Sequence, residues 1–233
     1  MKAALLADIH GNDAALRAVS DALKNAGIRR VLMLGDLCGY FPFVESCCDL
    51  LADFDVTAVM GNHDEIALRC METCSLPDEA YESRYGNALA RMLKEISPRT
   101  EQFLRTLPLS QEIFVGTRRV IMHHGSPQDS LHGRIYPDHA DWSPLEACTA
   151  DLLALGHTHY PLLKALPHTL VVNPGSVGQP RHRKGAWAAF AIYDADAHAV
   201  QLCEVGYDVS RIVADCLERQ PERASILKRF LSS

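Results

Sequence analysis

Apolar runs alternate with helical patterns over the first part of the chain. Residues 2–7 form an apolar run, residues 13–26 place apolar side chains at helical spacing, and further apolar runs follow at 31–34 and 56–60, with a second helix between them. Strands joined by helical crossovers run parallel, so their carboxyl ends should lie along one edge of a sheet. The pattern predicts an α/β fold. In open sheets of this kind, ligands bind at the carboxyl edge.

The pattern changes after the third strand. Residues 65–107 have the mixed polar and apolar pattern of helices, residues 125–142 have no clear period and are expected to form a long loop, and Ser143-Pro144 opens a short helix. A hairpin is predicted from 112–115 and 120–122. Further strands are predicted at 151–155, 170–172, 187–193 and 200–205, before a helical tail from about residue 209. With no repeats or linkers, we expect one domain over 1–233 with a helical insertion at about 65–107.

Composition narrows the class of protein. The chain has 233 residues, 48% of them hydrophobic and 22% charged, which is enough to bury a sizeable core. Its net charge of -6 disfavours extended nucleic acid as a partner. No apolar stretch approaches the ~18 residues of a membrane helix, and the first apolar run is too short for a signal peptide. Together with eight cysteines expected to be free thiols, this predicts a cytoplasmic protein.

Candidate metal ligands follow the predicted strands. The chain has 11 histidines, and several stand beside carboxylates at strand ends. Asp8 and His10 are two apart, so period-two alternation sends both side chains to the same side if the extended geometry persists. Imidazole and carboxylate together suit Mn, Fe, Zn or Ni. Seven side chains share the placement after an apolar strand: Asp8, His10, Asp36, Asn62, His124, His157 and His159.

Each of these motifs alone has an ordinary structural explanation. Asp8 could cap a helix beside a surface His10, and Gly35-Asp36 and Gly61-Asn62 are common turn sequences. Gly156-His157-Thr158-His159 is more specific, because two imidazoles beside a tight turn have few structural uses. The occurrence of these four motifs together with His124-Gly125 in one chain favours a metal centre.

In this order the motifs D-x-H, G-D, G-N-H-[DE], H-G and G-H-x-H resemble those of the calcineurin-like metallophosphoesterase superfamily. The resemblance extends through residues 107–109, 124–127 and 173–181 to its small prokaryotic branch, which includes YfcE-like phosphodiesterases. It implies a sandwich of two mixed β-sheets with flanking helices and with metals at the strand ends.

The resemblance also implies which residues bind two divalent metal ions, with Mn favoured. His123 adjoins His124 and could compete with it, but the family's ligand is the His immediately before Gly, which is His124. One ion is implied to bind Asp8, His10 and His159, the other Asn62, His124 and His157, and Asp36 would bridge them.

Two further positions are implied to act on the substrate. His63 would face the leaving-group oxygen as general acid, with Asp64 fixing its orientation; the alternatives are a phosphate-binding cation for His63 and a plain helix N-terminal acid for Asp64. Arg181 opens the densest basic cluster and could bind substrate, or it could belong to a solvated turn. Because His182 stands where the family often has an acidic residue, substrate specificity is not carried over.

The expected function is that of a two-metal phosphoesterase. A hydroxide between two metals would attack phosphorus in line, and the branch favours small nucleotide-like phosphodiesters as substrates. A serine/threonine-type protein phosphatase or a phosphomonoesterase is the alternative within enzymes. A non-catalytic metal-binding scaffold, like the retromer subunit related to this superfamily, is disfavoured by the complete ligand set. Association into a homo-oligomer is left open.

Overall fold

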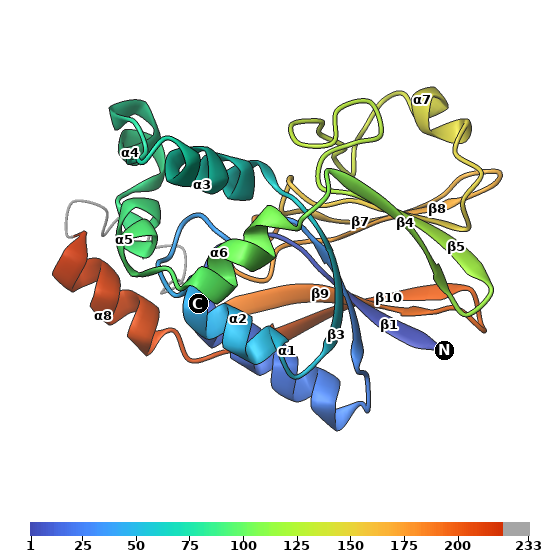
Figure 1. Cartoon of the computed structure of the whole chain (residues 1–233). Coiled ribbons are helices and arrows are strands. Elements are labelled where there is room, and N and C mark those ends of the chain that lie inside the picture. The colour runs from blue at the N-terminus through green and yellow to red at the C-terminus, as the bar shows by residue number, and fades with distance from the viewer. Residues whose placement is uncertain (221–233) are drawn as a thin grey trace.

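The computed structural model describes residues 1–220, and its strands form two five-stranded sheets (Figure 1). The first sheet has the order β10-β9-β1-β2-β3. The three strands nearest the N-terminus, β1 (Lys2–Leu6), β2 (Arg30–Leu34) and β3 (Asp55–Val59), run parallel. The sheet continues on the other side of β1 with antiparallel β9 (Trp187–Asp194) and β10 (Ala199–Gly206).

The second sheet is also mixed and has the order β4-β5-β6-β8-β7. The hairpin β4 (Ser110–Val115) and β5 (Arg118–His123) is antiparallel. Parallel strands β6 (Leu152–Ala154) and β8 (Leu170–Pro174) follow, and antiparallel β7 (Pro161–Ala165) forms the edge. Two mixed sheets with helices beside them confirm the predicted fold class.

Helices cover the first sheet and the end of the molecule beyond it (Figure 1). The segment between β3 and β4 is helical, as expected, although its first helix begins before residue 65. The described helices are α1 (Asp13–Asn25), α2 (Val44–Leu51), α3 (Asn62–Glu72), α4 (Glu79–Tyr85), α5 (Ala88–Glu95), α6 (Pro98–Arg105), α7 (Ser143–Glu146) and α8 (Ser210–Arg219). The predicted helical tail is confirmed as α8, and its part beyond residue 220 lies outside the described residues. Among residues 1–220, no helix has both the length and the apolar character needed to cross a membrane.

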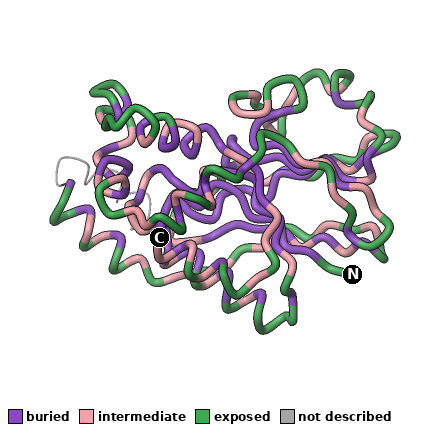
Figure 2. Tube along the Cα trace, in the orientation of Figure 1, coloured by how far each residue is buried: buried purple, intermediate pink, exposed green. Residues whose placement is uncertain are grey.

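The core has one layer between the sheets and another under the helices. Along β1, Ala3 and Leu5 pack between the two sheets, whereas Ala4 and Leu6 pack against the helical layer. Burial on both faces explains why this strand is a continuous apolar run rather than an alternating one. Figure 2 shows the buried residues gathered along the strands and the exposed ones on the outer helical surfaces and loops.

Strand β7 was not predicted from the sequence. It begins at Pro161, and its last three residues are exposed. Proline lacks the N–H that a central strand needs, and an exposed edge strand requires no apolar alternation. Pairing with β8 therefore creates a strand that the local sequence does not signal.

Candidate metal centre

The seven predicted ligands converge at the carboxyl ends of strands from both sheets. Asp8 and His10 follow β1, and Asp36 follows β2. The others follow β3, β5 and β6, so the centre lies where the two sheets meet. All seven are buried, none with more than 9% of its surface exposed: Asp8, His10, Asp36, Asn62, His124, His157 and His159.

The backbone that presents these ligands is not extended. The φ angles are 54° at Asp8, 53° at His10 and 56° at Asp36, and both histidines after β6 are also left-handed. The extended geometry on which the expected alternation of Asp8 and His10 depended is therefore absent, since β1 ends at Leu6 and the chain then turns. The two side chains nevertheless lie together, with His10 Nε2 3.9 Å from Asp8 Oδ1. Each left-handed non-glycine residue costs about 1 to 2 kcal/mol, and such strain gathers at functional sites.

Contacts between neighbouring loops hold this strained segment. The Asp8 N–H donates to the Gly35 carbonyl at 3.1 Å, and the His10 N–H donates to the Asp36 carbonyl at 2.9 Å. The Ser176 hydroxyl donates to the Asp8 carbonyl at 2.7 Å. The loops after β1 and β2 are thus fixed side by side.

The first ligand cluster consists of Asp8, His10 and His159. The Nε2 atoms of the two histidines lie 3.0 Å apart, and Asp8 Oδ1 lies 3.5 Å from His159 Nε2. Each ring donates its Nδ1–H to a main-chain carbonyl, of Cys38 for His10 and of Gln179 for His159. Burial lowers the pKa of His10 to about 3, so its ring is neutral.

Two neutral rings that donate from Nδ1 must carry lone pairs on Nε2. Lone pairs that face each other at 3.0 Å repel unless a cation lies between them. Among the described residues, Asp8 Oδ2 is buried without a hydrogen-bond partner. The cluster therefore has the donors and the unsatisfied oxygen that fit a divalent metal ion.

The second ligand cluster consists of Asn62, His124 and His157, with Asp36 beside it. His124 Nε2 lies 3.1 Å from Asn62 Oδ1, 3.2 Å from His157 Nδ1 and 3.3 Å from Asp36 Oδ2. Ligand atoms about 2.1 Å from one ion lie roughly 3.0 to 3.5 Å from each other, so these spacings fit a common ion. Asp36 Oδ2 is also 3.8 Å from His10 Nε2, so this carboxylate reaches both clusters.

The electrostatics of the centre also favour a cation. Burial raises the pKa of Asp8 to about 8. At His124, burial opposes protonation, but the attraction of Asp36 prevails and raises the pKa to about 9. Protons and metal ions are thus alternative ways to balance the same buried carboxylates, and metal binding should release protons.

The sequence led us to expect that Asp64 orients His63, but the two side chains have different partners. The Asp64 carboxylate is fully buried and accepts hydrogen bonds from the N–H groups of Asp36, Cys38 and Gly61 at 2.9, 2.9 and 3.0 Å. It joins the loop after β2 to the start of α3. The proposed orientation of His63 by Asp64 is therefore wrong: His63 Nδ1 lies 2.6 Å from the Tyr81 hydroxyl instead.

Gly61 is required by the close approach of the two loops. A Cβ atom at this position would lie 2.1 Å from Asp36 Oδ1, well inside van der Waals contact. The same oxygen accepts a hydrogen bond from the His63 N–H at 2.8 Å. The glycine of the G-N-H-D motif thus lets α3 begin directly against the carboxylate that the two clusters share.

A cavity of about 430 Å³ opens onto the centre. Arg181 lines it, as expected for a substrate contact, and donates to the Tyr40 hydroxyl at 3.3 Å. His182 and Arg183, by contrast, pair with Glu204 on β10. The residues around the cavity are Asp36, Tyr40, Asn62, His63, Ile66, Arg84, Tyr85, His132, Arg134, His157, His159 and Arg181.

The contribution of α4 to this site was not predicted from the sequence. Tyr81 contacts His63, while Arg84 and Tyr85 line the cavity. Their spacing of three and four residues places them on one helix face, which is the signal that was available. Such a face is equally typical of ordinary packing, so it indicates a functional contact only once the structure places α4 beside His63.

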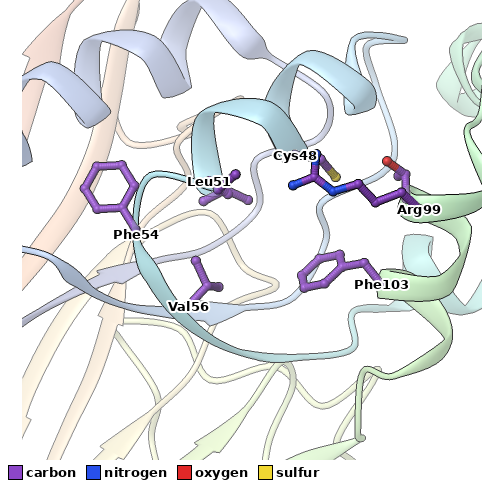
Figure 3. A pocket seen from close by; sticks show the side chains of 8 residues that line it. Cys48, Leu51, Phe54, Val56, Arg99 and Phe103 are labelled. Atoms are coloured by element: carbon purple, nitrogen blue, oxygen red, sulfur yellow. The ribbon is translucent and has the colours of Figure 1, made fainter.

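A second cavity, of about 230 Å³, lies between α2, β3 and α6 and shares no lining residue with the first. Figure 3 shows Leu51, Phe54, Val56 and Phe103 around it, with Arg99 extending toward Cys48. This lining is largely apolar and contains none of the predicted ligands.

Comparison with known proteins agrees with the geometry. A model described as the calcineurin-like phosphoesterase superfamily domain matches residues 1–198. An uncharacterized protein of Methanocaldococcus jannaschii is 30% identical over 226 residues, which cover 89% of this chain and 88% of that protein.

Two solved structures share nearly the whole fold. A hypothetical protein from Pyrococcus horikoshii has a TM-score of 0.78 at 25% identity, covering 97% of this chain and 96% of its own. A metallophosphoesterase from Sphaerobacter thermophilus has a TM-score of 0.76 at 27% identity, covering 98% of each chain.

Proposed function

The chain belongs to the calcineurin-like phosphoesterase superfamily, and on that premise we propose that it hydrolyses small nucleotide-like phosphodiesters with two divalent metal ions. The family supports phosphoric ester hydrolysis as the reaction. The observation that carries the two-metal proposal is the pair of buried ligand clusters joined by Asp36.

The ligand clusters define where the ions would bind. The first cluster would hold one ion, the second cluster the other, and Asp36 would contact both. Mn is favoured among Mn, Fe, Zn and Ni, all of which suit imidazole with carboxylate. When bound, such ions lower the pKa of a coordinated water and neutralise charge on the phosphoryl oxygens. With two divalent ions and the two carboxylates Asp8 and Asp36, the centre has a net charge of about +2, which attracts a phosphate ester.

Two arginines are placed to hold the scissile phosphoryl group. Arg134 Nε lies 3.1 Å from His157 Nε2, and Arg181 lies beside Tyr40 at the cavity wall. Within residues 1–220, neither forms an ion pair with a carboxylate within 4.0 Å. Their charge is therefore available to phosphate oxygens, which arginine binds through paired N–H groups.

His63 is placed to donate a proton to the leaving group. Burial raises the pKa of Tyr81, which therefore remains a phenol and can donate its O–H to His63 Nδ1. When the ring is protonated, Nδ1–H donates to the Tyr81 oxygen instead and Nε2 carries the second proton. Because His63 lines the cavity, the imidazolium can pass this Nε2 proton to the departing oxygen and return to the neutral ring. Tyr81 is then a positioning residue for His63, and Asp64 holds the loops that carry the ligands.

The decisive experiment removes and restores the metal. Protein stripped with a chelator and reloaded with Mn²⁺ should hydrolyse bis-p-nitrophenyl phosphate faster than p-nitrophenyl phosphate or a phosphoserine peptide. Asp36→Asn should abolish turnover and reduce bound metal, whereas the exposed Asp55→Asn on β3 should change neither. Faster hydrolysis of the monoester or the peptide would favour the alternative enzymes. No turnover with any divalent metal would favour a scaffold.

A second experiment tests the proton donor. With a poor leaving group, His63→Ala should slow turnover by about 10² to 10⁴, the range of general acid catalysis. Tyr81→Phe removes one hydrogen bond and should slow the same substrate about tenfold. Both variants should act much less on p-nitrophenyl esters, whose leaving group needs little protonation. Equal losses on good and poor leaving groups would contradict the role of His63 and of its partner.

A further inference from the structure

Helix α8 covers the back of the loop that carries Tyr40. Ile212 and Cys216, four residues apart on one face of the helix, form a buried cluster with Phe41 of this loop. The Phe41 N–H donates to the His10 carbonyl at 2.9 Å. The Tyr40 ring lies 4.6 Å from the His10 ring, measured between centroids. The position of α8 is therefore coupled to the position of Tyr40 at the cavity.

The far end of α8 contacts the segment that follows α4. The Asn87 side chain donates to the Arg219 carbonyl at 3.1 Å, and the Asn87 main-chain N–H donates to Gln220 Oε1 at 3.3 Å. Asn87 lies two residues after Tyr85, which ends α4 and lines the cavity. The rings of Tyr40 and Tyr85 meet nearly at right angles, with centroids 5.5 Å apart, and together form the aromatic wall of the cavity. One helix thus contacts both segments that carry this wall, and Figure 1 shows it beside α5, at the same end of the molecule as α4.

Two ion pairs fix α8 in this place. Its apolar interface is small, since two of its ten residues are buried, and a helix of this length is marginal in water by itself. In its first turn, Arg211 pairs with the buried Asp13 at the start of α1. In its middle, Asp215 accepts hydrogen bonds from both terminal nitrogens of Arg91 on α5, one of them 2.9 Å long. Paired N–H groups of this kind fix the orientation of the two side chains as well as their separation.

The ion pair of Arg91 and Asp215 stands apart from the metal centre. Asp13 lies three residues after His10, so a change at Asp13 would also disturb a candidate ligand. Arg91 and Asp215, by contrast, line no part of the cavity and belong to neither ligand cluster. Their side chains are 24% and 15% exposed, so the pair is screened by solvent less than an ion pair at the surface. Any effect of this pair on the substrate must therefore pass through α8 and the segments that it holds.

We propose that Arg91 and Asp215 are positioning residues for the substrate: their ion pair holds α8, and α8 holds the aromatic wall. This inference rests on the proposed function, because it takes the cavity as the place where the substrate binds. Tyrosine rings pack against the apolar or planar parts of a ligand, and Tyr40 also accepts a hydrogen bond from Arg181. The aromatic wall therefore contacts parts of the substrate that do not react. Contacts of this kind are equal in the ground state and the transition state, so their loss raises KM and leaves kcat unchanged.

Steady-state kinetics of Mn²⁺-loaded protein with bis-p-nitrophenyl phosphate test the inference. Arg91→Ala and Asp215→Ala should each raise KM about fivefold and change kcat less than about twofold. The double variant should be no worse than either single variant, because all three remove the same ion pair. Arg91→Lys keeps the charge and should recover part of the loss. Inorganic phosphate has no organic part, so its inhibition constant should change less than about twofold. Arg119→Ala removes a similar bidentate pair with Glu112 on the β4–β5 hairpin and is the matched control, which should change none of these values.

Hydrogen exchange gives a readout independent of turnover. In Arg91→Ala and Asp215→Ala, the main-chain amides of residues 37–43 and 79–87 should exchange about threefold faster or more, while those of residues 110–123 should not change. Unchanged KM in both variants, a loss in kcat alone, or unchanged exchange at residues 37–43 would overturn the inference alone. Failure of the wild-type protein to hydrolyse any phosphate ester, bis-p-nitrophenyl phosphate included, would instead overturn the proposed function, and the exchange rates would still decide whether the ion pair holds the aromatic wall.

Discussion

Replacing Asp64 by Asn tests whether this residue holds the loops or acts in the reaction. The Asp64 carboxylate accepts three main-chain hydrogen bonds, two at Oδ2, from Asp36 and Gly61, and one at Oδ1, from Cys38. Asparagine has only one acceptor oxygen. In its best orientation it keeps the two bonds at Oδ2 and turns its NH₂ group toward the Cys38 N–H, so that two donors face each other.

The magnitude follows from these contacts. A buried N–H left without an acceptor costs about 1 to 3 kcal/mol, and each of the two remaining bonds loses about 1 kcal/mol when its acceptor becomes neutral. Part of this is offset because a buried carboxylate is itself disfavoured, as the rise of the Asp64 pKa to about 6 through burial indicates. The net loss should be about 2 to 3 kcal/mol. For a chain of this size, that lowers Tm by roughly 4 to 12 °C.

Thermal unfolding in the presence of a chelator measures this loss, and metal content after reloading measures its effect on the ligands. We expect Asp64→Asn to lower Tm and bound metal together, because Asp36 sits in the loop that Asp64 holds. Asp21→Asn, an exposed acid on α1, is the matched control and should change neither. An unchanged Tm with turnover reduced as far as in His63→Ala would refute the reasoning and assign Asp64 a direct part in catalysis.

Two further substitutions probe close packing and charge. Gly61→Ala places a Cβ 2.1 Å from Asp36 Oδ1, so metal analysis should show that this variant loses bound metal. Gly206→Ala, whose Cβ would come no closer than 3.8 Å to any residue beyond its chain neighbours, is the control and should keep its metal. Full metal occupancy in both variants would contradict the steric argument. Hydrogen bonds from the Arg118 side chain and from the Arg119 main-chain N–H lower the pKa of Asp151. The ionised Asp151 carboxylate therefore stabilises the fold at pH values above its unfolded-state pKa of ~3.9, and this stabilisation is lost as the pH falls through the lower folded-state pKa. The free energies of unfolding of wild type and Asp151→Asn should differ at pH 7, and the difference should shrink as the pH falls below ~3.9. A difference that does not change with pH would refute this.

The sequence alone was sufficient to predict the described strands other than β7, and the polar residues that follow their ends. Apolar runs such as that of β1 are continuous because both faces are buried, and this property is local to the run. Right-handed crossovers then fix which ends of the strands meet, so His10 and Asp36 could be brought together from topology. The convergence of the candidate ligands was predictable because the chemistry at a strand end depends on residue type and on the order of strands.

The backbone conformation that brings the candidate ligands together was evident only from the tertiary structure. Asp8 and His10 adopt left-handed backbone that neither residue prefers, held by the loop after β2. The edge strand β7 exists through pairing with β8, since its own sequence has little β character. Both features arise from hydrogen bonds between segments far apart in the chain, which local propensity does not encode.

Only the tertiary structure showed which side chains surround His63 at the cavity beside the candidate metal centre. In sequence, Tyr81 is an aromatic residue on an amphipathic helix and Asp64 is an acid at a helix start. Packing places the Tyr81 hydroxyl 2.6 Å from His63 and buries Asp64 among main-chain amides, which reverses the partners expected for His63. The physical reason is that ligand types follow from the chemistry of each residue, whereas partners follow from how a helix packs against loops distant in sequence.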